Sequence, residues 1–238
     1  MALLWFHQQD GHRYEVRNAG NTVRLYSDGV FHSQYNPGRL TLGGLWDLLY
    51  LPMFMLPSAQ LQQVLLLGVG GGSVIHPINH WFAPAAIDAV EIDAHHLFVA
   101  QQYFAINDAN THLHHADVMA WLPEQQRQWD VIIEDVYGHL DGEPVRGVDH
   151  SRQWADQLFD HLQPHGLLIM NFTATRDMWL WLKNISRWRA ERLHFVQLQT
   201  DGYLNRVLLV SREPVNPRQL RNALPEALKR LRFKVLTV

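Results

Sequence analysis

The chain has 238 residues, enough for one α/β domain with a small appendage. Apolar residues make up 47% of it and its net charge is −3, which excludes a disordered chain and gives no sign of a nucleic-acid partner. It has no cysteine, which excludes disulfides, thiolate metal sites and a cysteine nucleophile. The most apolar segment, residues 45–56, is too short to span a bilayer, and the apolar start of the chain is too short for a secretory signal. We therefore expect a cytoplasmic protein with no membrane segment.

The first part of the chain is predicted to be rich in strands. Alternating segments at residues 14–17, 22–26 and 30–34 are separated by turn signals, and residues 45–56 resemble a helix that stops at Pro57. We therefore predict a small N-terminal β region over residues 1–57 and a nucleoside-binding catalytic domain over residues 58–238. The N-terminal β region and residues 45–56 could form the interface of a homodimer.

From residue 62 onward, apolar strand patterns alternate with helical ones, which predicts a parallel sheet with crossover helices. The predicted strands are residues 64–67, 86–92, 112–115, 129–134 and 166–172. The predicted helices are residues 73–82, 94–104, 151–162, 178–188 and a basic one at 218–232. Strands at 195–199 and 206–210 are too close for a helical crossover, so they should form an antiparallel hairpin. A Rossmann-like, doubly wound sheet that ends in such a hairpin is the class I S-adenosylmethionine (SAM) methyltransferase fold.

A glycine-rich turn is the strongest sign of function. Gly68, Gly70, Gly71 and Gly72 lie between the first buried strand and a helix for which Ser73 is the expected N-cap. Glycine lets a ligand approach the backbone closely, and the turn with the helix start would offer free N–H groups to it. The alternative is a tight turn without a ligand.

Acidic residues follow the next two strands. Glu91, beside Ile92, comes 23 residues after Gly68 (91 − 68), a spacing that suits ribose recognition in either NAD or SAM. Asp117, followed by Val118, could accept a hydrogen bond from the adenine amine. The alternatives are a solvent-facing carboxylate for Glu91 and a helix N-cap for Asp117.

The fourth strand supplies the candidate catalytic residues. Because the carboxyl ends of parallel strands face the ligand crevice, Asp135 should reach the reacting end of the cofactor, as a general base or as the partner of a cationic acceptor. Tyr137 is the second catalytic candidate, with a packed structural aromatic as the alternative. Glu134 is expected to point away from the site or to pair structurally, and residues 138–149 are expected to act as a lid loop. His139 is a further candidate for a substrate contact. No metal site is predicted, because the neighbouring histidines of residues 112–115 have no third ligand.

Together, residues 68–73, 90–93, 117 and 130–135 resemble the spermidine synthase-like (polyamine aminopropyltransferase) group of SAM-fold enzymes, over roughly residues 20–212. The resemblance implies that Glu91 and Asp117 hold ribose and adenine, and that Asp135 deprotonates an attacking amine. The sequence departs from that group at three places. Gly71 replaces an aspartate, Gly138 and His139 replace an Asp-Pro pair, and the group's acidic Asp-Glu and Tyr-His-Glu segment is not recognisable at residues 34–46.

These departures remove carboxylates that a dicationic diamine would need. The sequence therefore predicts a SAM-dependent transferase that moves a methyl group to a small-molecule acceptor. The alternatives are an aminopropyltransferase that uses decarboxylated SAM, an NAD-dependent dehydrogenase and a non-catalytic binding paralogue.

Overall fold

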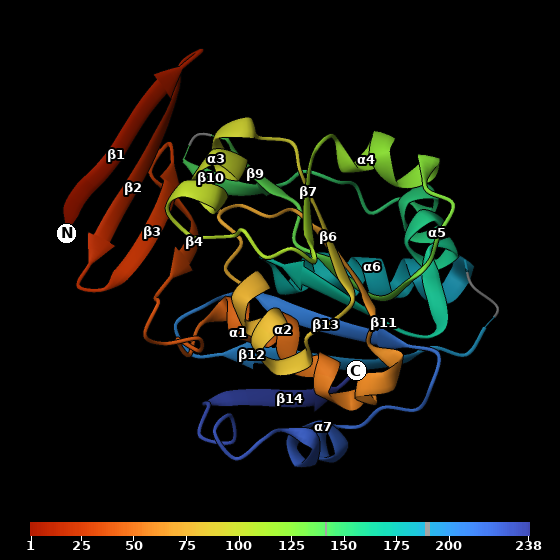
Figure 1. Cartoon of the computed structure of the whole chain (residues 1–238). Coiled ribbons are helices and arrows are strands. Elements are labelled where there is room, and N and C mark those ends of the chain that lie inside the picture. Colours follow the sequence, from red (N-terminus) through yellow and green to blue (C-terminus); the bar gives the residue numbers. More distant parts are fainter. Residues whose placement is uncertain (141, 189–190) are drawn as a thin grey trace.

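The computed structural model describes residues 1–140, 142–188 and 191–238. Its N-terminal part is an antiparallel sheet in the order β1-β2-β3-β4, which projects from one side of the molecule (Figure 1). The strands are β1 (Ala2–Gln9), β2 (His12–Ala19), β3 (Thr22–Ser27) and β4 (Val30–Tyr35). Three of them confirm the predicted strands. The sequence analysis missed β1, whose mostly exposed residues lack the alternation of a half-buried strand.

The main sheet has eight strands in the order β14-β12-β13-β11-β8-β5-β6-β7. These are β5 (Gln63–Leu67), β6 (Ala86–Glu91), β7 (Thr111–His115), β8 (Trp129–Glu134), β11 (Leu162–Phe172), β12 (His194–Thr200), β13 (Arg206–Ser211) and β14 (Phe233–Thr237). Neighbouring strands from β7 to β11 run parallel, whereas β13 pairs antiparallel with both β11 and β12. The predicted α/β fold and its antiparallel hairpin are therefore confirmed.

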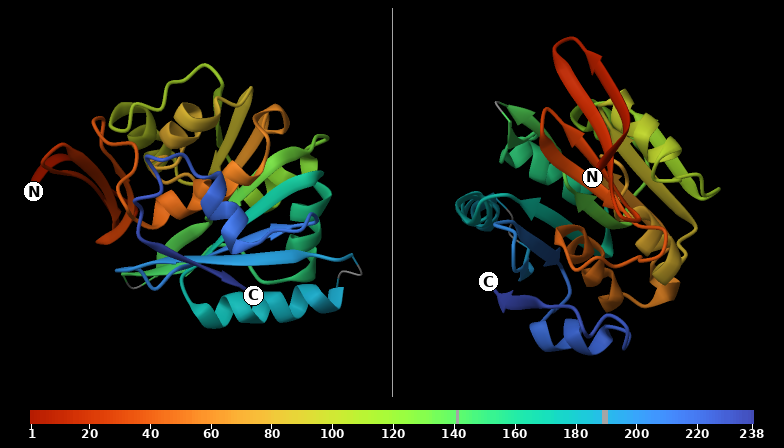
Figure 2. Two further views of the ribbon diagram at one scale, coloured as in Figure 1. Left: turned by 90° about the horizontal axis from the view of Figure 1, so that it is seen from below. Right: turned by 90° about the vertical axis from the view of Figure 1, so that its left-hand side faces the viewer.

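Helices cover both faces of this sheet, and Figure 2 shows α6 lying along one of them. The helices are α1 (Leu45–Tyr50), α2 (Ile75–Phe82), α3 (Ala94–Gln102), α4 (Val118–Trp121), α5 (Arg152–Asp160), α6 (Thr175–Trp188) and α7 (Pro217–Ala223). Short 3₁₀ segments lie at η1 (Leu51–Met55), η2 (Ser58–Gln60) and η3 (Leu122–Glu124). Two apolar clusters result, one on each face of the sheet, as a doubly wound architecture requires.

Three predicted elements are wrong in detail. Ser73 is not the N-cap of α2, because its Oγ accepts the backbone N–H of Gln34 at 2.9 Å and the helix starts at Ile75. The basic helix ends at Ala223, before Pro225, because a residue that precedes proline avoids helical geometry. The predicted lid loop is instead a hairpin of β9 (Tyr137–Leu140) and β10 (Glu143–Arg146).

Residues 45–56 pack largely within their own chain. Leu48, Leu49, Leu51 and Met53 are buried in the same apolar cluster as the strands of the main sheet. These four side chains are not available to a partner, and the interface predicted for the segment stays a prediction. The division of the chain into residues 1–57 and 58–238 stays a prediction.

Strand order reverses between β5 and β8, because the chain continues from β5 to β6 and β7 on one side and returns to β8 on the other. Ligands of open α/β sheets bind at the carboxyl ends of the strands at such a reversal. Within the residues that the structure describes, no helix is both long and apolar enough to cross a bilayer.

Candidate active site

A cavity opens at this strand reversal and holds about 790 Å³ of space, including solvent at its mouth. This volume suits a small-molecule ligand. The glycine turn, the ends of β6, β8 and β11, and the N-terminal sheet all contribute to its wall. The polar and aromatic residues of the wall are Phe31, His32, Trp46, Glu91, His96, Asp135, Tyr137, Asn171, Thr173, Tyr203 and Asn205.

The glycine turn forms the floor of the cavity through Gly68, Val69 and Gly70. Gly68 has a φ of 82°, and a side chain there would collide with the backbone carbonyl of Asp135, so only glycine lets β5 and β8 end this close together. Every N–H group from Gly68 to Gly72 already has an acceptor within the chain. The expectation of free N–H donors is therefore wrong, and a ligand would meet the turn mainly through its backbone surface.

Glu91 is the last residue of β6, and its carboxylate points toward the glycine turn. Its Oε2 accepts the N–H groups of Val69 at 2.9 Å and Gly70 at 2.8 Å, and its Oε1 accepts that of Asp93 at 3.0 Å. Burial opposes ionisation, but the neighbouring His96 and these N–H groups outweigh it and lower the pKa of Glu91 to about 2. Glu91 is thus an ionised carboxylate that lines the cavity and also fixes the shape of the turn.

Asp135 follows β8 and faces the same cavity. Its Oδ1 accepts the Nδ2–H of Asn171 at 2.7 Å, and Asn171 Oδ1 in turn accepts the Nδ2–H of Asn205 at 3.1 Å. Burial raises the pKa of Asp135 to about 6; the Asn171 hydrogen bond opposes this rise and the charge of Glu134 adds to it. A carboxylate with a pKa near the working pH suits a general base.

Behind Asp135, a buried polar network holds the end of β8 in place. Glu134 is fully buried and forms an ion pair with Arg146 of β10, which confirms its expected structural pairing. Arg146 also donates to the backbone carbonyl of Asn171 at 2.9 Å, as does the Tyr137 hydroxyl at 2.8 Å. The ring of Tyr137 lines the cavity while its hydroxyl is engaged in this network, so its catalytic role stays a prediction.

Other predicted cofactor contacts lie outside the cavity wall. Ile92 is 65% exposed, and Val118 is buried in the apolar cluster on the far side of the sheet. Asp117 accepts the N–H of Met119 at 2.9 Å as the N-cap of α4, which was its alternative role. Gly71 and Gly72 pack against Phe104 and Ile106. Whether any of these five residues contacts a cofactor remains a prediction.

The sequence analysis missed several cavity residues, above all His32. Burial, with the nearby His96 and His139, lowers the pKa of His32 to about 3, so its imidazole is neutral at pH 7. Its Nε2 is buried and has no hydrogen-bond partner among the described residues. Asn171 had a usable signal, because it is a lone amide near the end of the otherwise apolar strand 167–172.

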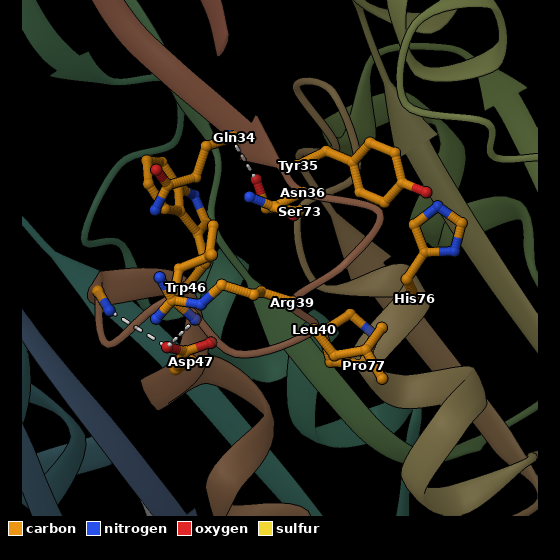
Figure 3. A pocket seen from close by; sticks show the side chains of 12 residues that line it. Gln34, Tyr35, Asn36, Arg39, Leu40, Trp46, Asp47, Ser73, His76 and Pro77 are labelled. Carbon is orange, nitrogen blue, oxygen red and sulfur yellow. Dashed lines mark hydrogen bonds between the residues drawn. The ribbon is translucent and has the colours of Figure 1, made fainter. Parts of the chain in front are cut away.

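A smaller cavity of about 360 Å³ lies on the other side of Trp46 (Figure 3). Its one acidic side chain among the described residues, Asp47, accepts the backbone N–H groups of Leu42, Gly43 and Gly44 at 2.5–3.1 Å. Asp47 is therefore committed to shaping the loop before α1. This cavity offers no free carboxylate for a cationic substrate.

Comparison with known proteins decides the family. The spermine/spermidine synthase domain model matches residues 47–204, more than half of the chain. The chain belongs to this family. The matched residues include Glu91 and Asp135, whose carboxylates line the cavity described above.

Individual relatives agree with the family match. A polyamine aminopropyltransferase of Vibrio vulnificus is 26% identical over 145 residues, covering 59% of this chain and 44% of the relative. The chain spans less than half the length of the curated relatives it matches. A probable spermidine synthase structure from Corynebacterium glutamicum shares the fold with a TM-score of 0.75 and 14% identity, over 100% of this chain and 91% of the other. A spermidine synthase complexed with the transition-state analogue AdoDATO matches with a TM-score of 0.68 and 15% identity, over 96% and 78% of the two chains.

The family match overturns the preference for methyl transfer, because the spermine/spermidine synthase model and the aminopropyltransferase relatives point to aminopropyl transfer instead. The preference rested on missing carboxylates, including the aspartate that Gly71 replaces. In the structure a Cβ at Gly71 would lie 2.7 Å from the ring of Phe104, so that ring fills the space an acidic side chain would need. The absence of a carboxylate at Gly71 is therefore no evidence for methyl transfer.

Replacing Gly71 with alanine should destabilise this spermidine synthase-like chain by about 1–3 kcal/mol, because the new methyl group overpacks a fully buried aromatic ring. The free energy of unfolding in urea measures the effect. Gly138→Ala is the matched control, because a Cβ there meets nothing within 4 Å. The double variant Gly71→Ala/Phe104→Leu should recover part of the loss; equal stability of Gly71→Ala and wild type would contradict the proposed contact.

Proposed function

We propose that the chain transfers the aminopropyl group of decarboxylated SAM to an amine. The observation that carries this proposal is one cavity with two carboxylates on opposite sides of the glycine turn, Glu91 and Asp135, in a chain of the spermine/spermidine synthase family. Glu91 would hold the ribose of the donor, and Asp135 would lie at the reacting end.

The reaction needs little from the protein beyond orientation and a base. The lone pair of the acceptor nitrogen attacks the aminopropyl carbon next to the sulfonium sulfur. The carbon–sulfur bond breaks, its electron pair neutralises the sulfur, and methylthioadenosine leaves. The nitrogen loses one proton, which Asp135 accepts. Placement of the two reactants supplies much of the rate, and the base supplies a further factor.

The acceptor we propose is an amine with a single cationic group, which is the group that the cavity recognises. Glu91 and Asp135 are the only carboxylates lining the cavity among the described residues, and Glu91 is already committed to three backbone N–H groups. A second ammonium group of a diamine would therefore leave water without a carboxylate partner, which costs free energy. The remaining wall, with Trp46, Tyr203 and Asn205, suits an apolar or uncharged polar extension.

The test is release of methylthioadenosine from decarboxylated SAM with two acceptors, putrescine and n-butylamine. We expect turnover with both and values of kcat/KM within about tenfold of each other. A preference of more than about 100-fold for putrescine would contradict the single-charge acceptor and leave aminopropyl transfer intact. No turnover with any amine, together with binding of methylthioadenosine, would favour the non-catalytic paralogue. Binding of NAD without methylthioadenosine would favour the dehydrogenase.

Asn171→Leu should shift the acid limb of the kcat/KM profile to higher pH. Asn171 donates to Asp135 at 2.7 Å and so favours its ionised form, and without this bond the pKa should rise above about 6. A hydrogen bond to a charged group corresponds to a shift of about one pH unit. The measurement is kcat/KM against pH, with the exposed Asn107→Leu as control. An unchanged limb would mean that Asp135 is not the titrating base.

We also propose that the chain forms a homodimer in the cytoplasm. Support for the dimer comes from β1, where Leu3, Leu4 and Phe6 are each 44% to 51% exposed on the N-terminal sheet. Sedimentation equilibrium at micromolar concentration tests it, and a monomer at all concentrations would reject it.

A further inference from the structure

Three side chains that are far apart in the sequence meet beside the candidate active site. His12 begins β2, Asp28 lies in the turn between β3 and β4, and His139 lies on β9. Asp28 Oδ2 is 2.8 Å from His12 Nδ1 and 2.5 Å from His139 Nε2. The three atoms lie within 4.8 Å of one another. Figure 1 shows β9 and β10 beside the N-terminal sheet, the arrangement that brings these residues together.

The carboxylate at the centre is held in place by the backbone. Asp28 Oδ1 accepts the N–H of Arg13 at 2.7 Å, and the N–H of Asp28 donates to the carbonyl of Arg13 at 2.8 Å. One carboxylate oxygen is thus fixed by the backbone, and the other is directed at both imidazoles.

The two imidazoles are free to offer lone pairs. The second nitrogen of His139, Nδ1, is buried without a hydrogen-bond partner among the described residues, so no contact there fixes which nitrogen carries the proton. The side chain of His12 is 55% exposed, so its second nitrogen can meet water. Either ring can therefore turn an unprotonated nitrogen toward Asp28 if a cation replaces the proton now shared there.

We propose that His12 Nδ1, Asp28 Oδ2 and His139 Nε2 bind a divalent transition-metal ion of the zinc class, with water as the remaining ligand. Two imidazoles and one carboxylate are a ligand set typical of zinc. A tetrahedral ion with bonds of 2.0–2.1 Å places its ligands roughly 3.3 Å apart, so ligand atoms within 4.8 Å need only small side-chain adjustments. A neutral imidazole would coordinate through the nitrogen that carries no proton, and an imidazolium would first release one proton to solvent.

The ion would join two elements that both line the cavity. The β9–β10 hairpin contributes Tyr137 and Pro144, and the N-terminal sheet contributes Val30, Phe31 and His32. A metal at this point would hold the hairpin against the sheet and stiffen the mouth of the cavity. The site does not depend on the proposed function, because its ligands lie outside the cavity wall.

The test is a titration of the full chain, stripped with a chelator, with Zn²⁺ in a calorimeter and with Co²⁺ in a spectrophotometer. We expect one site per chain with a raised melting temperature, and strong visible Co²⁺ bands of four-coordinate geometry. Mg²⁺ should not compete, because it prefers an all-oxygen octahedral shell. His12→Gln and His139→Gln should each weaken Zn²⁺ binding by about 10- to 100-fold and abolish the Co²⁺ bands.

The chain has 15 histidines, so His112→Gln, at an exposed position away from the cluster, is the control and should bind like wild type. Because His12 is on the surface, His12→Gln should fold normally, and its circular dichroism spectrum and chelator-treated melting temperature check this. Equal Zn²⁺ affinity in wild type, His12→Gln and His139→Gln would overturn the proposal. Six-coordinate Co²⁺ spectra that survive both substitutions would also overturn it.

Discussion

Asp135→Asn is expected to lower kcat/KM for the acceptor by about 100- to 10,000-fold, the contribution typical of a general base. The substitution keeps the size of the side chain and an oxygen that can accept from Asn171, but it removes the ability to take a proton. With a pKa of about 6, Asp135 is ionised at pH 7.5, and wild-type kcat/KM should fall about tenfold per unit as the pH drops below 6. The variant should lack this acid limb.

Two further measurements separate a chemical role from a structural one. Binding of methylthioadenosine, which carries no group for Asp135 to deprotonate, should change by less than about threefold in Asp135→Asn. The exposed Asp108→Asn is the matched control and should behave like wild type. If Asp135→Asn keeps its rate within about threefold, another group is the base. If it also loses methylthioadenosine, the residue acts through the shape of the site.

Local patterns were sufficient for the parts of the site that lie at strand ends. A buried strand followed by glycines, and acidic residues after the next strands, predict that Gly68, Glu91 and Asp135 lie at one edge of a parallel sheet. All three line the cavity. The prediction worked because the parallel sheet itself, through its strand order, brings those chain positions together.

What the pattern could not give was the partner of each polar group. The glycine turn was expected to offer its N–H groups to a ligand, but Glu91 and Ser33 accept three of them. Ser33 comes from the N-terminal sheet, whose docking against the turn has no local signal. The same holds for Arg146, whose pairing with Glu134 depends on the β9–β10 hairpin, where the sequence predicts a loop.

The surroundings of the departures from the family motif show why the sequence pointed to the wrong transferred group. The aspartates missing at Gly71 and Gly138, and the proline replaced by His139, suggested a lost diamine site. In the structure Phe104 packs against Gly71 and Asp28 contacts His139, whereas a Cβ at Gly138 would meet nothing within 4 Å. A one-residue comparison with a family motif detects what is absent, whereas only the packed structure shows what has taken its place.

Glu91→Gln is expected to reduce the free energy of unfolding at pH 7 by about 2–4 kcal/mol. Val69, Gly70 and Asp93 donate backbone N–H groups to this carboxylate, and a glutamine must turn an NH₂ group toward at least one of them, leaving a buried donor unpaired. In a chain of this size each kcal/mol corresponds to about 2–4 °C in melting temperature. Binding of methylthioadenosine should weaken as well, because the turn that forms the floor of the cavity loses its anchor.

The pH dependence of the stability separates an effect of the Glu91 charge from an effect of packing alone. The pKa of Glu91 is lowered from 4.5 to about 2 in the folded chain, so its stabilisation is complete above pH 4.5 and is lost as the pH falls toward 2. Glutamine does not titrate. The difference in the free energy of unfolding between wild type and Glu91→Gln should therefore become smaller as the pH falls from 5 to 3.5. Urea unfolding across this range measures the gap, with the exposed Glu124→Gln as control. A gap that stays constant with pH would mean that the carboxylate charge does not hold the turn.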